Sequence, residues 1–293
     1  MIDQFLNYLR HERYRSSQTV QTYEKALREF ESYISLRDNG LSLKSADADI
    51  IRDWMESLMD KGNSASTIDK KLSALRSFYR FSLKRKLVER DPAHAIAGVK
   101  KAKPLPQFVR ESEMNRLLDD VEWGNDFKDV RTRTLLLLLY ETGIRRSELT
   151  GLNDADVDLA AGQLKVTGKR NKQRIVPFGE ELAMQLKRYL AVRKDTFGMV
   201  ADGALFLSDK GCRLSGDQLY QTVRKYLSLV TTLKKRSPHV LRHSFATAML
   251  NNGAGLEGIS KLLGHASAST TEIYTHTTFE QLKRVYKDAH PRA

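Results

Sequence analysis

Cysteine, proline and glycine are all scarce in this chain of 293 residues, and each scarcity excludes a class of protein. The one cysteine, Cys212, can form neither an internal disulfide nor a zinc site alone, so we expect a reducing compartment instead of a secreted disulfide framework. Six prolines and 17 glycines, without a low-complexity tract, exclude collagen-like and mucin-like chains and argue against intrinsic disorder.

Long apolar runs and a secretion signal are also missing. The longest apolar run, Leu135 to Tyr140, is far shorter than the ~20 residues that a membrane-spanning helix needs. The first residues, from Met1 to Leu6, lack the basic start and apolar core of a signal peptide. We therefore expect a soluble, cytoplasmic protein with no membrane contact.

What the chain does have is an excess of positive charge. Lys and Arg number 49 against 36 Asp and Glu, which gives a net charge of +13. Residues 1–103 hold 20 basic and 14 acidic residues and the remainder hold 29 and 22, so the two parts carry +6 and +7. Because a basic tail on a neutral enzyme would divide unevenly, the pattern indicates two basic domains that close around a polyanion.

The first hundred residues have apolar side chains at helical spacing and few alternating β-branched stretches. This pattern predicts a bundle of about four helices. We expect the first helix over residues 2–10, the second after a cap at Ser17 or Thr19, the third around Trp54, and the longest from Ser66 onward.

The helix expected from Ser66 has a single apolar stripe, and basic side chains surround its other faces. The five basic residues that we select as candidate phosphate contacts are Lys70, Lys71, Arg76, Arg80 and Lys84. Such contacts to phosphate would position the protein without specifying a sequence.

A change of composition marks the domain boundary. Residues 99–106 read Val-Lys-Lys-Ala-Lys-Pro-Leu-Pro, and three lysines with two prolines and no periodicity are typical of an extended linker. We therefore predict an N-terminal helical domain over residues 1–98, a basic linker over 99–108 and a C-terminal domain over 109–293.

The second domain is predicted to be mostly helical with one small sheet. Three short strands are expected over residues 156–159, 163–167 and 174–178, which would form an antiparallel sheet. Helices are expected from Ser112, around residues 133–140, and over 180–192, 215–229 and 238 to the end. The fold class is mainly α, with a four-helix bundle followed by a helical domain that contains a three-stranded antiparallel sheet.

Four segments of the second domain carry side chains that could act on a phosphodiester. They are Thr-Gly-Ile-Arg-Arg-Ser-Glu-Leu at 142–149, the strand turn at 169, His-Val-Leu-Arg-His at 239–243, and Leu-Gly-His with Ile-Tyr-Thr-His at 263–276. Each alone has a plainer explanation, since turn lysines usually solubilise and histidines near helix ends are often structural. Together they supply two guanidiniums, an ammonium, two imidazoles and a phenol, which are the groups that metal-free phosphoryl transfer requires.

Other phosphate chemistries find no support in the sequence. No carboxylate pair has the spacing of metal ligands, which argues against a two-metal nuclease, and we expect neither a metal nor a cofactor. Gly168-Lys169 is not preceded by a glycine-rich run, which excludes the phosphate loop of an NTPase.

The order and context of these residues closely resemble the tyrosine recombinase (phage integrase) family, and within it the Xer-type recombinases that resolve chromosome dimers. The resemblance covers essentially the whole chain. The family's pattern of Arg, Lys, His-x-x-Arg, His and Tyr matches Arg145, Lys169, His239, Arg242, His265 and Tyr274. The absence of an added N-terminal arm-binding domain and the ending Ala-His-Pro-Arg-Ala favour the Xer type.

The resemblance implies a mechanism of strand exchange. Tyr274 would attack the scissile phosphodiester and form a 3′-phosphotyrosyl link, so that rejoining needs neither ATP nor a metal. Arg145 and Arg242 would hold the non-bridging oxygens, a task for which lysine is a poor substitute. Lys169 would protonate the leaving 5′-oxygen, and His239 would accept the phenol proton.

The resemblance also implies roles for neighbouring residues. His265 would hydrogen-bond the phosphate, Glu148 could orient an arginine, and His243 could simply pack beside the site. His276 is a weaker candidate. The first domain would be the core-binding half of a DNA clamp, with Arg10, Arg13 and Arg15 adding to its basic faces.

The implied partners are double-stranded DNA and further recombinase subunits. A C-terminal helix with Leu282, Val285 and Tyr286 at helical spacing could pack on its own domain, but the family docks such a helix on a neighbour, which suggests a cyclic tetramer on two sites. The tetramer could include a paralogous recombinase, and a septal DNA translocase is a possible activator. Alternatives are an integrase of a phage or mobile element, a type IB topoisomerase and a non-catalytic DNA-binding protein.

Overall fold

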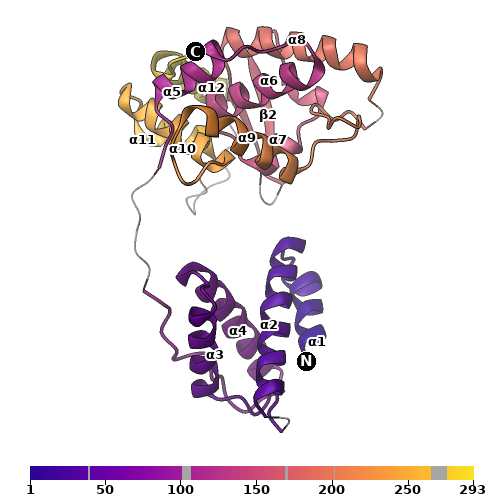
Figure 1. The fold of residues 1–293 in the computed structure, drawn as a ribbon, viewed down its shortest axis with the longest axis vertical. Coiled ribbons are helices and arrows are strands. Elements are labelled where there is room, and N and C mark those ends of the chain that lie inside the picture. The colour runs from indigo at the N-terminus through magenta and orange to yellow at the C-terminus, as the bar shows by residue number, and fades with distance from the viewer. Residues whose placement is uncertain (39, 101–106, 169–170, 201, 265–275) are drawn as a thin grey trace. The chain divides into compact units, whose positions relative to one another are not determined.

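Helices make up most of the chain (Figure 1). The computed structural model describes residues 1–38, 40–100, 107–168, 171–200, 202–264 and 276–293. The chain divides into two compact units, Met1–Pro104 and Leu105–Ala293. The predicted fold class is confirmed, because a helical unit is followed by a mostly helical unit with one three-stranded antiparallel sheet. Most of the predicted linker, residues 101–106, lies outside the described residues.

The first unit is built from four α-helices and one π-helical turn. These elements are α1 (Ile2–Asn7), the turn η1 (Tyr8–Glu12), α2 (Ser17–Arg37), α3 (Ala48–Asp60) and α4 (Ala65–Lys84). Their apolar faces enclose a core in which Phe30 lies against Trp54, with ring centroids 4.9 Å apart. The hydroxyl of Tyr79 reaches out of this core and donates to the carbonyl of Leu43 at 3.0 Å.

Serine and aspartate side chains set where these helices begin. Ser16 accepts from the backbone N–H of Thr19, and Ser64 accepts from that of Thr67, each satisfying a donor that a helix start leaves unpaired. The prediction of a cap at Ser17 or Thr19 is therefore wrong by one or three residues, and that of a helix start at Ser66 by one. Each helix start offers two serines as possible caps, Ser16 and Ser17 or Ser64 and Ser66. The path of the preceding chain decides which of them takes the capping position.

The second unit begins with short helices and ends with long ones. Its helical elements are α5 (Glu111–Asn115), the π-helical turn η2 (Arg116–Asp120), α6 (Phe127–Thr142), α7 (Arg146–Thr150), the 3₁₀ turn η3 (Asp154–Asp156), α8 (Glu180–Phe197), α9 (Gly216–Val230), α10 (Pro238–Asn251), α11 (Leu256–Leu263) and α12 (His276–Ala289). The strands are β1 (Val157–Asp158), β2 (Gln163–Thr167) and β3 (Gln173–Pro177).

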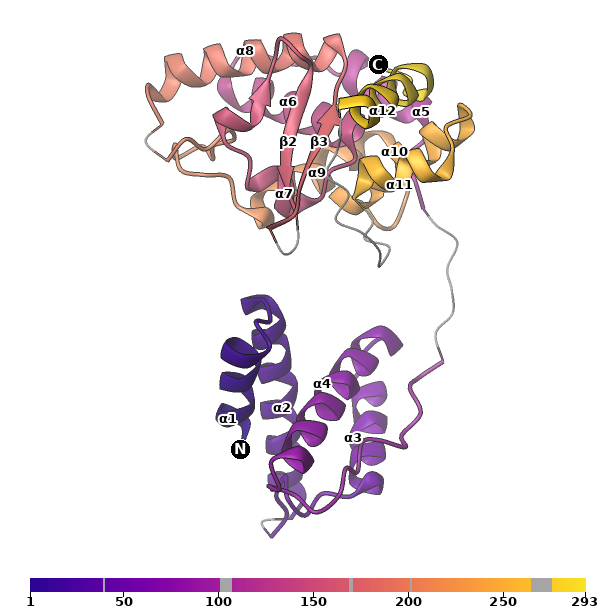
Figure 2. The same cartoon turned by 180° about the vertical axis from the view of Figure 1, so that it is seen from behind.

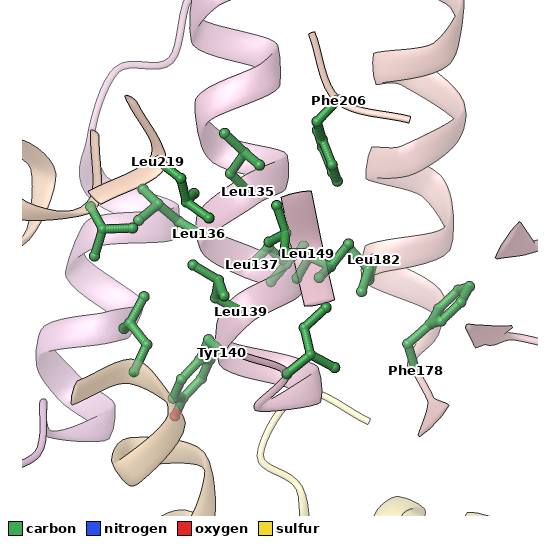
Figure 3. Close-up of a cluster of buried hydrophobic side chains, with 14 of the residues drawn as sticks. Leu135, Leu136, Leu137, Leu139, Tyr140, Leu149, Phe178, Leu182, Phe206 and Leu219 are labelled. Atoms are coloured by element: carbon green, nitrogen blue, oxygen red, sulfur yellow. The ribbon is translucent and has the colours of Figure 1, made fainter. Parts of the chain in front are cut away.

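Helix α6 lies at the centre of the second unit. Leu135 to Tyr140 are all buried, so this helix is apolar on every side, as a helix enclosed by other elements must be. Figure 3 shows Leu149 of α7, Leu182 of α8 and Leu219 of α9 around it. Because α6 cannot move without disturbing this core, the loop that leaves its C-terminus is held firmly.

The sheet is antiparallel in the order β1-β2-β3. Leu164 is opposite Val176, and Val166 is opposite Arg174, so these four residues share the buried face of the sheet. An arginine on an apolar face needs a partner with negative charge, and that partner belongs to the site described below.

The C-terminal part forms a satellite core. Figures 1 and 2 show α10, α11 and α12 gathered at one end of the second unit, where Phe245, Leu262, Leu282 and Tyr286 pack together. The prediction of helix from 238 to the end is too simple, since Gly253 and Gly264 have positive φ values and separate the segments. Within the ranges that the structure describes, no helix has the length and apolar character to cross a membrane.

Candidate active site

The loop after α6 presents the first arginine of the site. Gly143 ends α6 with φ +57°, and a Cβ atom there would lie 2.6 Å from the ring of Phe245 and 2.8 Å from Leu263. Only glycine fits this position, because the backbone here is left-handed and the side chains of Phe245 and Leu263 leave no room for a Cβ atom. The next turn makes Arg145 the residue that precedes α7, directly after the buried Ile144.

Glu148 is the centre of the site. Its side chain is only 2% exposed. It accepts hydrogen bonds from the backbone N–H and Nη1 of Arg145 at 2.8 and 2.7 Å. It also accepts from Nη1 and Nη2 of Arg174 at 2.9 and 2.8 Å, so one carboxylate joins two arginines from distant parts of the chain.

Three arginines bind three successive carbonyl groups at the end of α11. Nε of Arg174 donates to Leu262 at 2.9 Å, Nη2 of Arg242 to Leu263 at 2.7 Å, and Nη2 of Arg145 to Gly264 at 3.0 Å. The last carbonyls of a helix lack partners within the helix and carry its partial negative charge. Cations at this end satisfy both needs.

The second predicted arginine lies in α10. Arg242 is 8% exposed, and its Nη1 also donates to the carbonyl of Gly143 at 2.7 Å. The loop after α6 and the end of α11 are thereby joined through one guanidinium. The structure thus brings together Arg145, Glu148 and Arg242 from the sequence-predicted set.

The charges of this cluster favour an anion. Three arginines, 145, 174 and 242, face one carboxylate, which leaves a local charge of about +2. Burial lowers the pKa of Arg242 to about 10, helped by the charges of Arg145 and Arg174. Burial alone would raise the pKa of Glu148, but the hydrogen bonds and charges of Arg174 and Arg145 lower it to about 2. Arg242 and Glu148 are therefore both ionised at neutral pH, and a phosphate would relieve the crowding of positive charge.

His239 lies one turn before Arg242 on α10. Partial burial lowers the pKa of its imidazole, and the charges of Arg242, His243, Arg146 and Arg145 lower it further. A neutral imidazole at pH 7 can accept a proton. His243, considered as a packing residue in the sequence, is exposed instead of buried.

A basic pocket adjoins His239. It has a volume of about 550 Å³, and its lining includes Arg146, Arg224 and the run Lys234-Lys235-Arg236. Sequence reasoning overlooks this pocket, although three consecutive basic residues directly before α10 are a visible signal. Its basic lining suits a strand of phosphodiesters that passes His239.

Arg174 is the other residue that sequence reasoning overlooks. The signal that could have found it is the alternation of β3, which places a charged residue on the same face as Val176. Because an unpaired buried charge is very unfavourable, such a residue implies a buried carboxylate nearby.

Three of the sequence-predicted residues, Lys169, His265 and Tyr274, lie outside the described residues. The residues that precede Lys169 and His265 are described: Gly168 donates its N–H to the carbonyl of Lys172 at 2.8 Å at the base of the β2–β3 hairpin. Gly264, which precedes His265, is the residue bound by Arg145. Among the described residues, no group of three His, Cys, Asp or Glu side chains could hold a metal ion.

The basic residues predicted on α4 do not behave alike. Lys70, Arg80 and Lys84 are exposed. Lys71 is 16% exposed and pairs with Glu29 at 2.7 Å. The guanidinium of Arg76 donates to the backbone carbonyls of Ala93 and Ile96, where it holds the chain that follows the helix. Of the five, only Lys70, Arg80 and Lys84 are presented to solvent as DNA contacts would be.

The chain has two helical units, and an arginine cluster lies directly before the segment that contains Tyr274. These features are typical of proteins that break and rejoin DNA. Comparison with known families agrees. The phage integrase family matches residues 107–281, and the phage integrase N-terminal SAM-like domain matches residues 2–86. The chain belongs to the phage integrase family.

Individual relatives are similar over their whole length. The tyrosine recombinase XerC of Chlorobaculum tepidum is 38% identical, with 100% of this chain and 94% of the relative covered. The tyrosine recombinase XerD of Staphylococcus epidermidis is 36% identical, with 100% and 99% covered. The XerH site-specific recombinase, solved in a post-cleavage complex with a palindromic difH substrate, is 26% identical with a TM-score of 0.73, covering 97% of this chain and 83% of that one.

Proposed function

We propose that this protein is a site-specific tyrosine recombinase that exchanges DNA strands through a 3′-phosphotyrosyl intermediate and a Holliday junction. The observation that carries the proposal is the binding of Arg145 and Arg242 to consecutive carbonyls immediately before the segment that contains Tyr274. Both guanidiniums thus bind carbonyls that precede Tyr274 in the sequence by about ten residues. The full-length similarity to XerC and XerD supports the same conclusion.

The proposed chemistry assigns one role to each group. The phenol oxygen of Tyr274 attacks phosphorus, and the P–O5′ bond breaks. His239 takes the phenol proton, and Lys169 gives a proton to the leaving 5′-oxygen. The phosphodiester is conserved as a phosphotyrosine, so the reverse attack by a 5′-hydroxyl restores DNA without ATP.

The arginines supply the electrostatic part of the mechanism. Arg145 and Arg242 hold the non-bridging oxygens and stabilise the charge that develops on them, and His265 adds a hydrogen bond. The buried carboxylate of Glu148 accepts a hydrogen bond from Nη1 of Arg145 and so helps to fix the orientation of this guanidinium. Because the protein dipoles are in place before DNA arrives, little reorganisation is needed in the transition state.

The proposed setting is the resolution of chromosome dimers at cell division. The partners would be double-stranded DNA at two sites, a tetramer of recombinases that could include a paralogous subunit, and a septal DNA translocase as activator. The boundaries proposed for the working parts are residues 1–98 for core binding, 99–108 for the linker and 109–293 for catalysis. Lys70, Arg80 and Lys84 are the proposed phosphate contacts of the first part.

A trapping experiment tests this function. The protein is incubated with fragmented, lightly nicked genomic DNA of its source organism, because cleavage beside a nick releases a short strand and leaves the covalent adduct unable to reverse. We expect a denaturation-resistant protein–DNA adduct that Tyr274→Phe does not form although it still binds DNA. An adduct formed by the Phe variant would contradict the assigned nucleophile.

The DNA recovered from the adduct separates the alternatives. A single chromosomal locus is expected for a dimer-resolution enzyme, whereas the ends of a phage or mobile element would indicate an integrase. Relaxation of a supercoiled plasmid that lacks the recovered site would indicate a type IB topoisomerase. Binding without any adduct would indicate a non-catalytic DNA-binding protein.

A further inference from the structure

Arg174 is a buried charged residue to which the proposed chemistry gives no part. Its side chain is 6% exposed. Both of its terminal nitrogens contact Glu148, and its Nε donates to the carbonyl of Leu262 at 2.9 Å. One guanidinium thus joins three segments: strand β3, helix α7 and the end of α11.

We infer that Arg174 is a positioning residue that orients Arg145 through Glu148 and braces the end of α11. The inference rests on the proposed recombinase function, since it assigns Arg174 a task in presenting Arg145 to the scissile phosphate. Arg174 does not contact the reacting atoms itself.

The sharing of Glu148 is the first argument. Nη1 of Arg145 and Nη1 of Arg174 both donate to Oε1 of Glu148, at 2.7 and 2.9 Å. Because Arg174 occupies both carboxylate oxygens, Glu148 cannot form a second two-armed pair with the side chain of Arg145. Arg145 therefore uses one terminal nitrogen for Glu148 and the other for Gly264, and two of its five N–H groups account for these side-chain bonds. Without Arg174, a rotated Glu148 could draw the whole guanidinium of Arg145 away from the phosphate.

The order of the three carbonyls is the second argument. Leu262, Leu263 and Gly264 each accept from a different arginine, and Arg174 takes the innermost position. Loss of that bond would leave the Leu262 carbonyl without this donor and loosen the helix end that Arg145 and Arg242 use as their reference. Both proposed phosphate-binding arginines depend on where this end lies.

The third argument is that two glycines make room for the contact. A Cβ atom on Gly264 would lie 3.1 Å from Cδ, Nε and Nη1 of Arg174. A Cβ atom on Gly168 would lie 3.2 Å from Oε1 of Glu148 and 3.8 Å from Nη1 of Arg174. The Arg174–Glu148 pair is enclosed on both sides by backbone without side chains. Close enclosure of this kind holds a guanidinium in one orientation.

The variant Arg174→Lys tests the inference, with Arg193→Lys as its matched control. Arg193 is equally buried, at 7% exposure, and binds Asp154 through both terminal nitrogens at 2.8 Å, together with the carbonyls of Ala204 and Leu205. It lies on α8, outside the arginine cluster. Both variants lose the same kind of two-armed bond. Asp154 is 44% exposed whereas Glu148 is 2% exposed, so the melting temperature of each variant is measured to account for its own loss of stability.

The measurement is the single-turnover rate of adduct formation at saturating DNA. The substrate is the recovered site with sulfur in place of the bridging 5′-oxygen, whose thiolate leaving group needs no proton and attacks the adduct poorly. We expect Arg174→Lys to slow this rate about 10²-fold, since a displacement of about 1 Å can have that effect. DNA affinity should change no more than in Arg193→Lys, which should retain the wild-type rate, and the rates are measured at a temperature where both variants are fully folded.

A double-variant comparison identifies the residue through which Arg174 acts. If Arg174 acts largely through Arg145, then the rate defect of Arg145→Lys with Arg174→Lys is clearly smaller than the product of the two single defects, and the remaining effect of Arg174→Lys passes through Arg242 at the shared helix end. Full multiplication of the two defects would overturn the inference, as would a rate for Arg174→Lys equal to that of Arg193→Lys. The inference would also be overturned if Arg174→Lys reacted slowly on the ordinary oxygen substrate but at the wild-type rate on the sulfur substrate. The defect would then lie in protonation of the leaving group. Absence of any adduct with the wild-type protein, in contrast, would reject the proposed function itself.

Discussion

Arg145 and Arg242 donate to neighbouring carbonyl groups, those of Gly264 and Leu263, although they come from the start of α7 and from the middle of α10. The end of α11 is therefore a common reference for both guanidiniums. The segment that contains Tyr274 begins after Gly264. A displacement of this helix end would therefore move Arg145, Arg242 and the first residue of that segment together.

Replacing either arginine by lysine should slow cleavage strongly. A lysine keeps the charge, but its single nitrogen lacks the planar fork with which a guanidinium binds separate acceptors through separate nitrogens. Loss of one preorganised donor typically reduces the chemical rate by about 10²–10³. Single-turnover adduct formation by Arg242→Lys, with DNA affinity measured separately, checks this. A rate within a few-fold of wild type would contradict the assigned role.

The pH dependence of cleavage should report His239. Burial and neighbouring positive charges lower the pKa of this imidazole below 6.5, so it is already neutral at pH 7. As the solution is acidified, the rate should therefore begin to fall at a lower pH than it would for a base with the pKa of an ordinary imidazole. In His239→Gln the rate should be lower and this acidic decline should vanish. A decline that begins above pH 7 in the wild type would argue against His239 as the base.

The docking of α12 should weaken in acid. Burial lowers the pKa of His290 to about 4, against 6.5 for an exposed imidazole, and its ring stacks on Phe245 and Tyr286. Because the unfolded chain binds the proton more readily, the contribution of His290 is complete above pH 6.5 and is lost as the pH falls toward 4.

Urea unfolding at several pH values measures this effect. Between pH 6.5 and 5 the wild type should lose up to ~2 kcal/mol more than His290→Gln, at 1.36 kcal/mol per pH unit for a single site. The same pH profile in both proteins would show that His290 is not buried as a neutral ring.

Gly143→Ala should be far more damaging than Gly253→Ala. Both glycines have positive φ values, +57° and +86°, so alanine is strained at either position by ~1–2 kcal/mol. A Cβ atom at Gly143 would also meet the buried Phe245 and Leu263, whereas nothing lies within 4 Å at Gly253. Overpacking adds about 1–3 kcal/mol, measured as the difference in unfolding free energy. Equal effects would contradict the tight contact.

The exposed basic residues of α4 should contribute to the salt dependence of binding. Lys70→Gln, Arg80→Gln and Lys84→Gln together should reduce the slope of log affinity against log salt by up to about 3, at ~0.9 for each phosphate contact. A matched triple variant of Lys187, Arg188 and Lys194, which are exposed on α8, controls for the change of total charge. An equal reduction in both variants would mean that α4 makes no specific phosphate contact.

The amino-acid sequence by itself determined the fold class, the helical bundle and the group of residues that can process a phosphodiester. Side-chain periodicity shows which face of each element is apolar, and the His-Val-Leu-Arg-His segment places His239 and Arg242 one helical turn apart. These are local properties. Precise helix starts were less predictable, because Ser64 and Ser66 are equally good caps until the preceding chain is placed.

Only the tertiary structure decided which charged residues act together. Arg174 looks like an ordinary strand residue until the pairing with Val166 turns it inward onto Glu148, while Arg76 looks like a DNA contact until it binds the carbonyl of Ala93. The physical reason is that a buried charge is acceptable only beside a partner, and partners separated by dozens of residues meet only when the core has formed.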